Sequence, residues 1–223
     1  MPRISANKLG EYLVTTSPTR RRRIILDQKQ PSQAVVPLYR LADEPLAAFF
    51  AGGGDQTELD RAVVRLKSDT SGTTWAIDDR RRTAEALEAI LGLAHKLPKD
   101  GIAYTPGQEH PPQLQIKGLN ISVAPHFLLR FEHRGVPCVG ALKFHYPKSA
   151  DLALEQKGGE YVATLLHQWL TLHGPRNHKP MPSHCLSIDV FRGAVVAAPN
   201  ASTRRMADIA AACEEIAAHW QQL

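Results

Sequence analysis

The sequence has few cysteines, few aromatic residues and no long apolar run. Its three cysteines, Cys138, Cys185 and Cys213, are widely spaced and form no CxxC pair. An odd and scattered set of this kind argues against a disulfide framework and against a zinc cluster. We therefore expect reduced, mostly buried thiols and a cytoplasmic protein. No stretch approaches the roughly 20 apolar residues that cross a bilayer, so we expect no membrane partner.

Acidic residues are outnumbered by basic ones, 22 against 27, which gives a formal net charge of +5. The basic residues are clustered along the chain. They form three blocks: Arg20, Arg21, Arg22 and Arg23; Arg80, Arg81 and Arg82; and Arg204 with Arg205. Clustered guanidinium groups neutralise phosphates and release counterions, which favours nucleic acid or a phosphorylated ligand as partner. The alternative is that these blocks are solvated helix faces.

Length and composition fit a single unit. A chain of 223 residues with 43% hydrophobic residues suits one α/β domain, or one domain with a helical extension. Helical periodicity dominates residues 1–97, residues 98–112 are rich in Pro, Gly and charge and read as a linker, and residues 113–223 mix strands with helices. We expect an α/β fold of the α+β kind, in which the helical N-terminal half packs as one unit on a small mixed β-sheet flanked by helices.

The individual elements follow from the apolar spacing. In the N-terminal half we predict helices at residues 4–14, 19–28, 44–51, 57–66 and 77–97, with Ser5 as an N-cap of the first. In the C-terminal half we predict strands at 114–123, 127–133 and 137–146, a helix at 156–172, a loop at 174–183, a hairpin at 185–198 and a closing helix at 201–221.

Three short motifs lie on this framework. Pro125-His126 precedes one strand, Ala141-Leu142-Lys143 lies on the next, and Glu160-Tyr161 lies on the helix that follows. In their order these elements resemble the PD-(D/E)XK nuclease superfamily, and more loosely its RecB-like exonuclease branch, over residues 114–198. In that superfamily Pro-Asp opens one strand, Glu-x-Lys lies on the next, and a helix with Gln or Glu and then Tyr follows. The N-terminal stretch ISANKLGEYLVTTSPTRRRR is a weaker point of similarity.

The resemblance implies a restriction-endonuclease-like core in which acids bind Mg²⁺ or Mn²⁺ and the lysine activates water. This sequence departs from the pattern at both central acids, which are His126 and Ala141 here. Mg²⁺ prefers carboxylate oxygens, so we expect weak metal-dependent nuclease activity or none. If activity exists, the resemblance assigns water orientation to Lys143, support of the metal or the lysine to Glu160, and metal ligation to His126.

Other interpretations stay open at this point. Lys143 is also typical of a lysine that snorkels at a sheet edge, and Tyr161 of a core aromatic residue. Two functions fit the sequence. The first is a nucleic-acid-associated protein on a degenerate nuclease-like core, of the kind found in defence, repair and mobile-element contexts. The second is a protein-binding adaptor or inhibitor subunit of a nucleoprotein complex, without catalytic activity.

Overall fold

The computed structural model describes residues 1–31 and 39–222 and has an α+β fold, as the sequence predicts. Its α-helices are α1 (Ala6–Val14), α2 (Pro18–Lys29), α3 (Asp43–Ala51), α4 (Thr57–Ser68), α5 (Thr74–Leu93), α6 (Glu155–His173) and α7 (Thr203–Gln222). In the described ranges, 3₁₀ turns lie at Arg40–Ala42, Ala94–Lys96 and Ala150–Leu152. Within the described residues, no helix combines the length and the apolar character of a membrane span.

A five-stranded mixed sheet forms the centre of the molecule. Its order is β2 (Ala103–Pro106), β5 (Phe127–His133), β6 (Val136–His145), β7 (Lys179–Asp189) and β8 (Ala194–Ala197). β6 and β7 run parallel, and α6 connects them, because parallel neighbours need a crossover. The other neighbours pair antiparallel.

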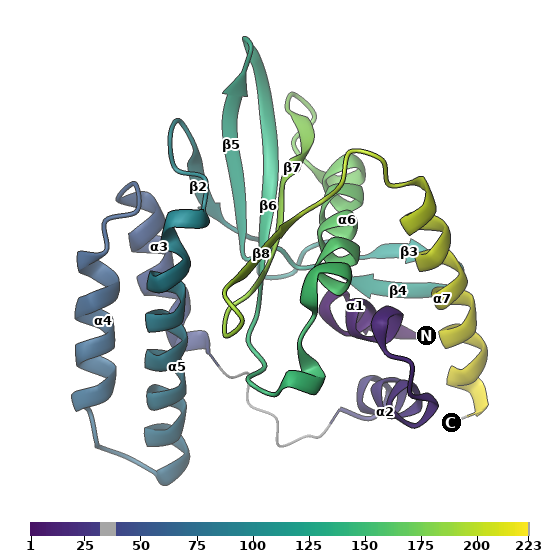
Figure 1. The fold of residues 1–223 in the computed structure, drawn as a ribbon, viewed down its shortest axis with the longest axis horizontal. Helices are drawn as coiled ribbons and strands as arrows, with labels where there is room; N and C mark the ends of the chain where they lie inside the picture. Colours follow the sequence, from purple (N-terminus) through teal and green to yellow (C-terminus); the bar gives the residue numbers. More distant parts are fainter. Residues whose placement is uncertain (32–38, 223) are drawn as a thin grey trace.

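Helices cover both faces of this sheet (Figure 1). α3, α4 and α5 pack on the face that carries Leu142 and Phe144 of β6. α1 and α6 pack on the opposite face, with Ala141 of β6. Since side chains alternate along a strand, Lys143 shares the face of Ala141 and lies under α1 and α6.

The first 29 residues belong with the C-terminal core rather than with the helical layer α3–α5. β1 (Arg3–Ser5) pairs parallel with β4 (Leu119–Ser122), which also pairs with β3 (Leu114–Ile116) in a second, three-stranded sheet. Leu9 and Tyr12 of α1 are buried in the same cluster as α6 and α7. As predicted, Ser5 caps α1, and its hydroxyl accepts the N–H of Lys8.

Three segments differ from their predicted structure. Residues 114–123 form two short strands instead of one, because Lys117 and Gly118 take left-handed backbone angles that reverse the chain. The predicted linker contains β2, which pairs with β5 along four residues. The predicted loop at 174–183 already contains the start of β7. Pro180 and Pro182 had favoured a loop there, because proline is uncommon within strands.

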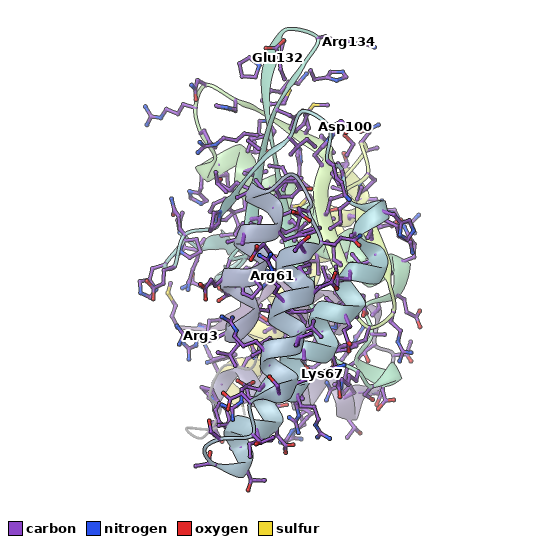
Figure 2. The ribbon with its side chains drawn as sticks, turned by 90° about the vertical axis from the view of Figure 1, so that its left-hand side faces the viewer. Arg3, Arg61, Lys67, Asp100, Glu132 and Arg134 are labelled. Carbon is purple, nitrogen blue, oxygen red and sulfur yellow. The ribbon has the colours of Figure 1, made fainter. Side chains whose placement is uncertain are left out.

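The β5–β6 hairpin projects from the body. Its turn is Arg134-Gly135, and the positive φ of both residues (53° and 76°) is typical of a type I′ turn. Figure 2 shows Glu132 and Arg134 at this tip, beyond the helices, whereas Arg61 and Lys67 lie on the outer helical layer. The sequence predicted this turn correctly at residues 133–135.

Gly140 lies where the β6–β7 register shifts, between Val139 and Ala141. A Cβ at this position would lie 2.2 Å from the backbone oxygen of His184. We therefore expect Gly140→Ala to lower the free energy of unfolding by about 2 kcal/mol, because backbone on the neighbouring strand must move. Urea unfolding measures this. Gly92→Ala is the control, since a Cβ there meets open space in a helix; an equal loss in both variants would contradict the prediction.

Candidate nucleic-acid interface

Lys143 is held in the interior of the protein. Its side chain is 7% exposed, and its ammonium group donates to the backbone oxygen of Ala124 at 2.9 Å. Burial lowers its pKa from 10.5 to about 8. Ala124 itself has a positive φ of 42°, so its backbone departs from the conformation of a regular strand. The ammonium group of Lys143 is thus hydrogen-bonded to the backbone next to the Pro125-His126 segment.

His126 also makes a backbone contact. Its Nδ1 accepts the N–H of Phe144 at 3.1 Å, and its ring lies against Phe144 and Tyr146. Burial, with a smaller effect from the charge of Lys143, lowers the pKa of His126 from 6.5 to about 3. The imidazole is therefore neutral, with Nδ1 engaged by the strand rather than offered to a metal.

The structure brings Lys143 and His126 together but directs Glu160 elsewhere. Glu160 lies on α6, where its carboxylate accepts from Gln156 at 2.9 Å and pairs with Arg205 of α7. The side-chain bond from Gln156 and the pairing with Arg205 lower the pKa of Glu160 despite partial burial. Its neighbour Tyr161 donates to Asp208 of α7 at 2.7 Å.

The donor set around Lys143 does not fit Mg²⁺. Ala141 pairs across the strands with Cys185, both are fully buried, and neither supplies oxygen. No three His, Cys, Asp or Glu side chains in the described part of the chain are grouped so that they could share a metal ion. A Mg²⁺ site needs several oxygen ligands in near-octahedral geometry, and the side chains of Ala141 and Cys185 beside Lys143 do not supply them.

Sequence reasoning missed a set of buried polar groups at the ends of β6 and β7. His145 and Asp189 pair in register, and each is 3% exposed. His145 Nε2 lies 2.7 Å from the oxygen of Leu152, and Asp189 accepts the N–H groups of Leu154 and Arg192. These contacts fasten the segment before α6 to the sheet.

The basic blocks differ in how many of their charges have partners. Arg20 pairs with Glu11, a carboxylate of α1 that is only 2% exposed, and Arg23 pairs with Asp27 at 2.8 Å. On α5, Arg80 donates to the backbone of Asp69 and Ser71 and thereby closes the α4–α5 loop. Arg81 pairs with Asp78 at 3.0 Å, and Arg82 is exposed. Arg20 and Arg80 are therefore engaged in holding the fold, whereas the pairs of Arg23 and Arg81 are exposed surface pairs that stabilise it little.

A groove, here called the α7 groove, runs along α7 where this helix faces α1, α2 and α6. It consists of three adjoining hollows of about 550, 370 and 390 Å³, and neighbouring hollows share lining residues. The α7 side is lined by residues that lie one, three or four positions apart and therefore share one side of the helix: Arg204, Arg205, Asp208, Ala211, Ala212, Glu215, His219 and Gln222. At 1.5 Å per residue, this face extends over about 27 Å.

The groove has an excess of unpaired positive charge. Arg22, Lys157 and Arg204 line it, are exposed, and form no ion pair with any residue of the described ranges. Its acids are engaged within the chain: Glu160 pairs with Arg205, and Asp208 accepts from Tyr161. Glu215 lies 3.6 Å from Arg21, and burial, with a smaller effect from Glu215, raises the pKa of Tyr12. The groove therefore carries more positive than negative side chains.

Comparison with known proteins adds no family: no protein-family model matches the sequence, and no curated protein matches it significantly. The case for function therefore depends on the geometry of the α7 groove and of the Lys143 region. The spacing of Arg204, Asp208 and Glu215 is visible in the sequence. That this face meets Lys157 and Arg22 is not, because α2, α6 and α7 are far apart along the chain.

Proposed function

We propose that this protein binds nucleic acid in the α7 groove and does not cleave it efficiently. The observation that carries the proposal is the set of three exposed cations, Arg22, Lys157 and Arg204, that share one groove without an ion-pair partner among the described residues. Cations placed along a groove can contact successive phosphates of a strand and release its counterions. The formal net charge of +5 supports the same polyanionic partner.

The groove is framed by contacts that hold its walls in place. Tyr161 of α6 donates to Asp208 near the start of α7, and Lys29 of α2 donates to the backbone oxygen of Trp220 at its other end, at 2.8 Å. Because both ends of α7 are tied to the opposite wall, the cations need little rearrangement on binding. Preorganisation of this kind lowers the entropic cost of association.

Weak or absent cleavage follows from the Lys143 region. Phosphodiester cleavage by this class of core relies on metal charge near the scissile phosphate. Here Ala141 provides no ligand, His126 Nδ1 is engaged by Phe144, and Lys143 is hydrogen-bonded to Ala124. His126 and Lys143 are instead hydrogen-bonded to the protein backbone, which supports binding without efficient cleavage.

The experiment compares the parent with Lys157→Ala/Arg204→Ala in fluorescence-anisotropy titrations of a labelled single-stranded oligonucleotide, between about 50 and about 200 mM salt. We expect about tenfold weaker binding, equivalent to about 1.4 kcal/mol. We also expect the slope of log K against log salt to become shallower by about 1.4, since each lost phosphate contact removes about 0.7 in single strands. Parallel incubations with Mg²⁺ and then Mn²⁺ should show no more than weak cleavage.

Arg61→Ala/Arg81→Ala is the matched control. It also removes two cations, but these residues lie on the outer helical layer and pair with Glu58 and Asp78 (Figure 2 shows Arg61). Its binding should equal that of the parent. A loss in this control but not in the groove variant would place the interface on α4 and α5. If the parent fails to bind and instead copurifies with a protein, the adaptor function would replace the proposal.

A further inference from the structure

The widest part of the α7 groove lies between α2 and the C-terminal half of α7, and its volume is about 550 Å³. Its walls combine apolar, charged and polar side chains, whereas a site for phosphates alone would need only cations and hydrogen-bond donors. The apolar lining consists of the exposed Pro18 and the almost fully buried Ile25 of α2, Arg21 lies over the Tyr12 ring, and Glu215 and Gln222 supply polar groups. Phosphates and sugars need cations and hydrogen-bond donors, whereas an apolar wall beside a flat cation suits an aromatic ring.

Arg21 is fixed in a position suited to stacking. Its guanidinium carbon lies over the Tyr12 ring, 5.1 Å from the ring centre. Its Nε donates to the backbone oxygen of Thr15 at 3.0 Å, and Nη1 lies 3.6 Å from Glu215. The side chain is still 36% exposed, so another part of it is open to the groove. Guanidinium planes held in this way are stacking platforms for unpaired bases.

We infer that this cavity holds one unpaired nucleobase of the bound strand, stacked against Arg21 and bordered by Ile25 and Pro18. Gln222 and Glu215 border the same cavity and can meet the polar edge of the base. Arg22 lies beside the cavity, and Lys157 and Arg204 continue along the groove, so the adjoining phosphates have cations to meet. A base inside a duplex is stacked on both sides, so the bound strand is single-stranded at this point. This inference rests on the proposed function.

The test uses a single-stranded oligonucleotide of about 12 thymidines and a strand of equal length made of abasic deoxyribose phosphate. Both carry the same charge, so binding through phosphates alone treats them alike. We expect the thymidine strand to bind about tenfold more tightly, because base stacking adds to the phosphate contacts. Thr16→Trp, an exposed residue that lines the cavity, should fill the space and abolish most of this preference.

Leu172→Trp is the control, since it adds the same ring at an exposed position that is 60% accessible and lies outside the cavity lining. It should keep the tenfold preference. Equal binding of both strands by the parent, with strong salt dependence, would overturn the base pocket and leave the proposed function standing. A preference that survives Thr16→Trp would also overturn it. Failure of the parent to bind either strand at low salt would remove the proposed function, and the inference with it.

Discussion

Acidification from pH 6.5 towards pH 3 is expected to destabilise this protein by about 4 to 5 kcal/mol through His126. The folded-state pKa of this imidazole is about 3, lowered mainly by burial and then by Lys143, from 6.5. Between these values the unfolded chain binds a proton that the folded protein does not, so stability falls as pH falls. The contribution is fully present above pH 6.5 and is lost progressively towards pH 3. Each pKa unit corresponds to about 1.4 kcal/mol.

The variant that isolates this effect is His126→Asn. Asparagine has no titrating group, and its side-chain oxygen can replace Nδ1 as acceptor of the Phe144 N–H. At neutral pH the variant should lose about 1 to 2 kcal/mol because part of the ring volume becomes a cavity. Between pH 6.5 and pH 4, however, urea unfolding should give a flatter dependence on pH than in the parent.

His133→Asn, on the exposed hairpin, is the control and should keep the slope of the parent. The same slope in His126→Asn and in the parent would show that His126 is not buried as a neutral acceptor. In that case the assignment of Nδ1 to Phe144 would be wrong, and His126 would again be open to a metal.

The second large effect concerns Lys143. Replacing it by Met is expected to remove a gain in stability of about 3 kcal/mol that the parent shows between pH 8 and pH 10.5. Burial depresses the folded-state pKa of Lys143 from 10.5 to about 8. Between these values the unfolded chain holds the proton and the folded protein has lost it, so stability rises with pH in the parent. At neutral pH the lysine is charged and buried, and Met should stabilise the protein.

The measurement is the difference in unfolding free energy between the parent and Lys143→Met from pH 7.5 to pH 10. Taking the difference cancels the contribution of buried tyrosines such as Tyr104. Burial raises the pKa of Tyr104, and this lowers stability at high pH equally in both proteins. Lys67→Met, in an exposed pair with Glu88, is the control and should follow the parent throughout. A Met variant that is less stable than the parent at pH 7.5 would contradict the prediction.

The Lys143 result also bears on function. A lysine that serves catalysis lowers the stability of the fold but is needed for activity, whereas a lysine that only binds the Ala124 backbone can be replaced without loss of function. We expect the Met variant to bind single-stranded DNA like the parent, because Lys143 is not among the residues that line the α7 groove. The effect of Lys143 on stability and the binding of DNA in the α7 groove can therefore be measured independently.

The sequence by itself determined the class of fold and most of the elements. Apolar periodicity placed the long helices and the β5–β6 hairpin, because helix and strand periods differ and Arg134-Gly135 suits a tight turn. It also placed His126 just before one strand and Lys143 on the next, and in the structure the charge of Lys143 acts on His126. These inferences depend on local spacing, which a single sequence records directly.

Only the tertiary structure decided what the charged residues do. Arg20 to Arg23 look equivalent in sequence, yet Arg20 contacts a buried acid while Arg22 faces a groove, since neighbouring positions on a helix point about 100° apart. Glu160 was predicted beside Lys143, but α6 turns it towards Arg205 of α7. The α7 groove joins α2, α6 and α7, whose packing depends on contacts between residues far apart in the chain. Spacing along one helix cannot show which other helix it will face.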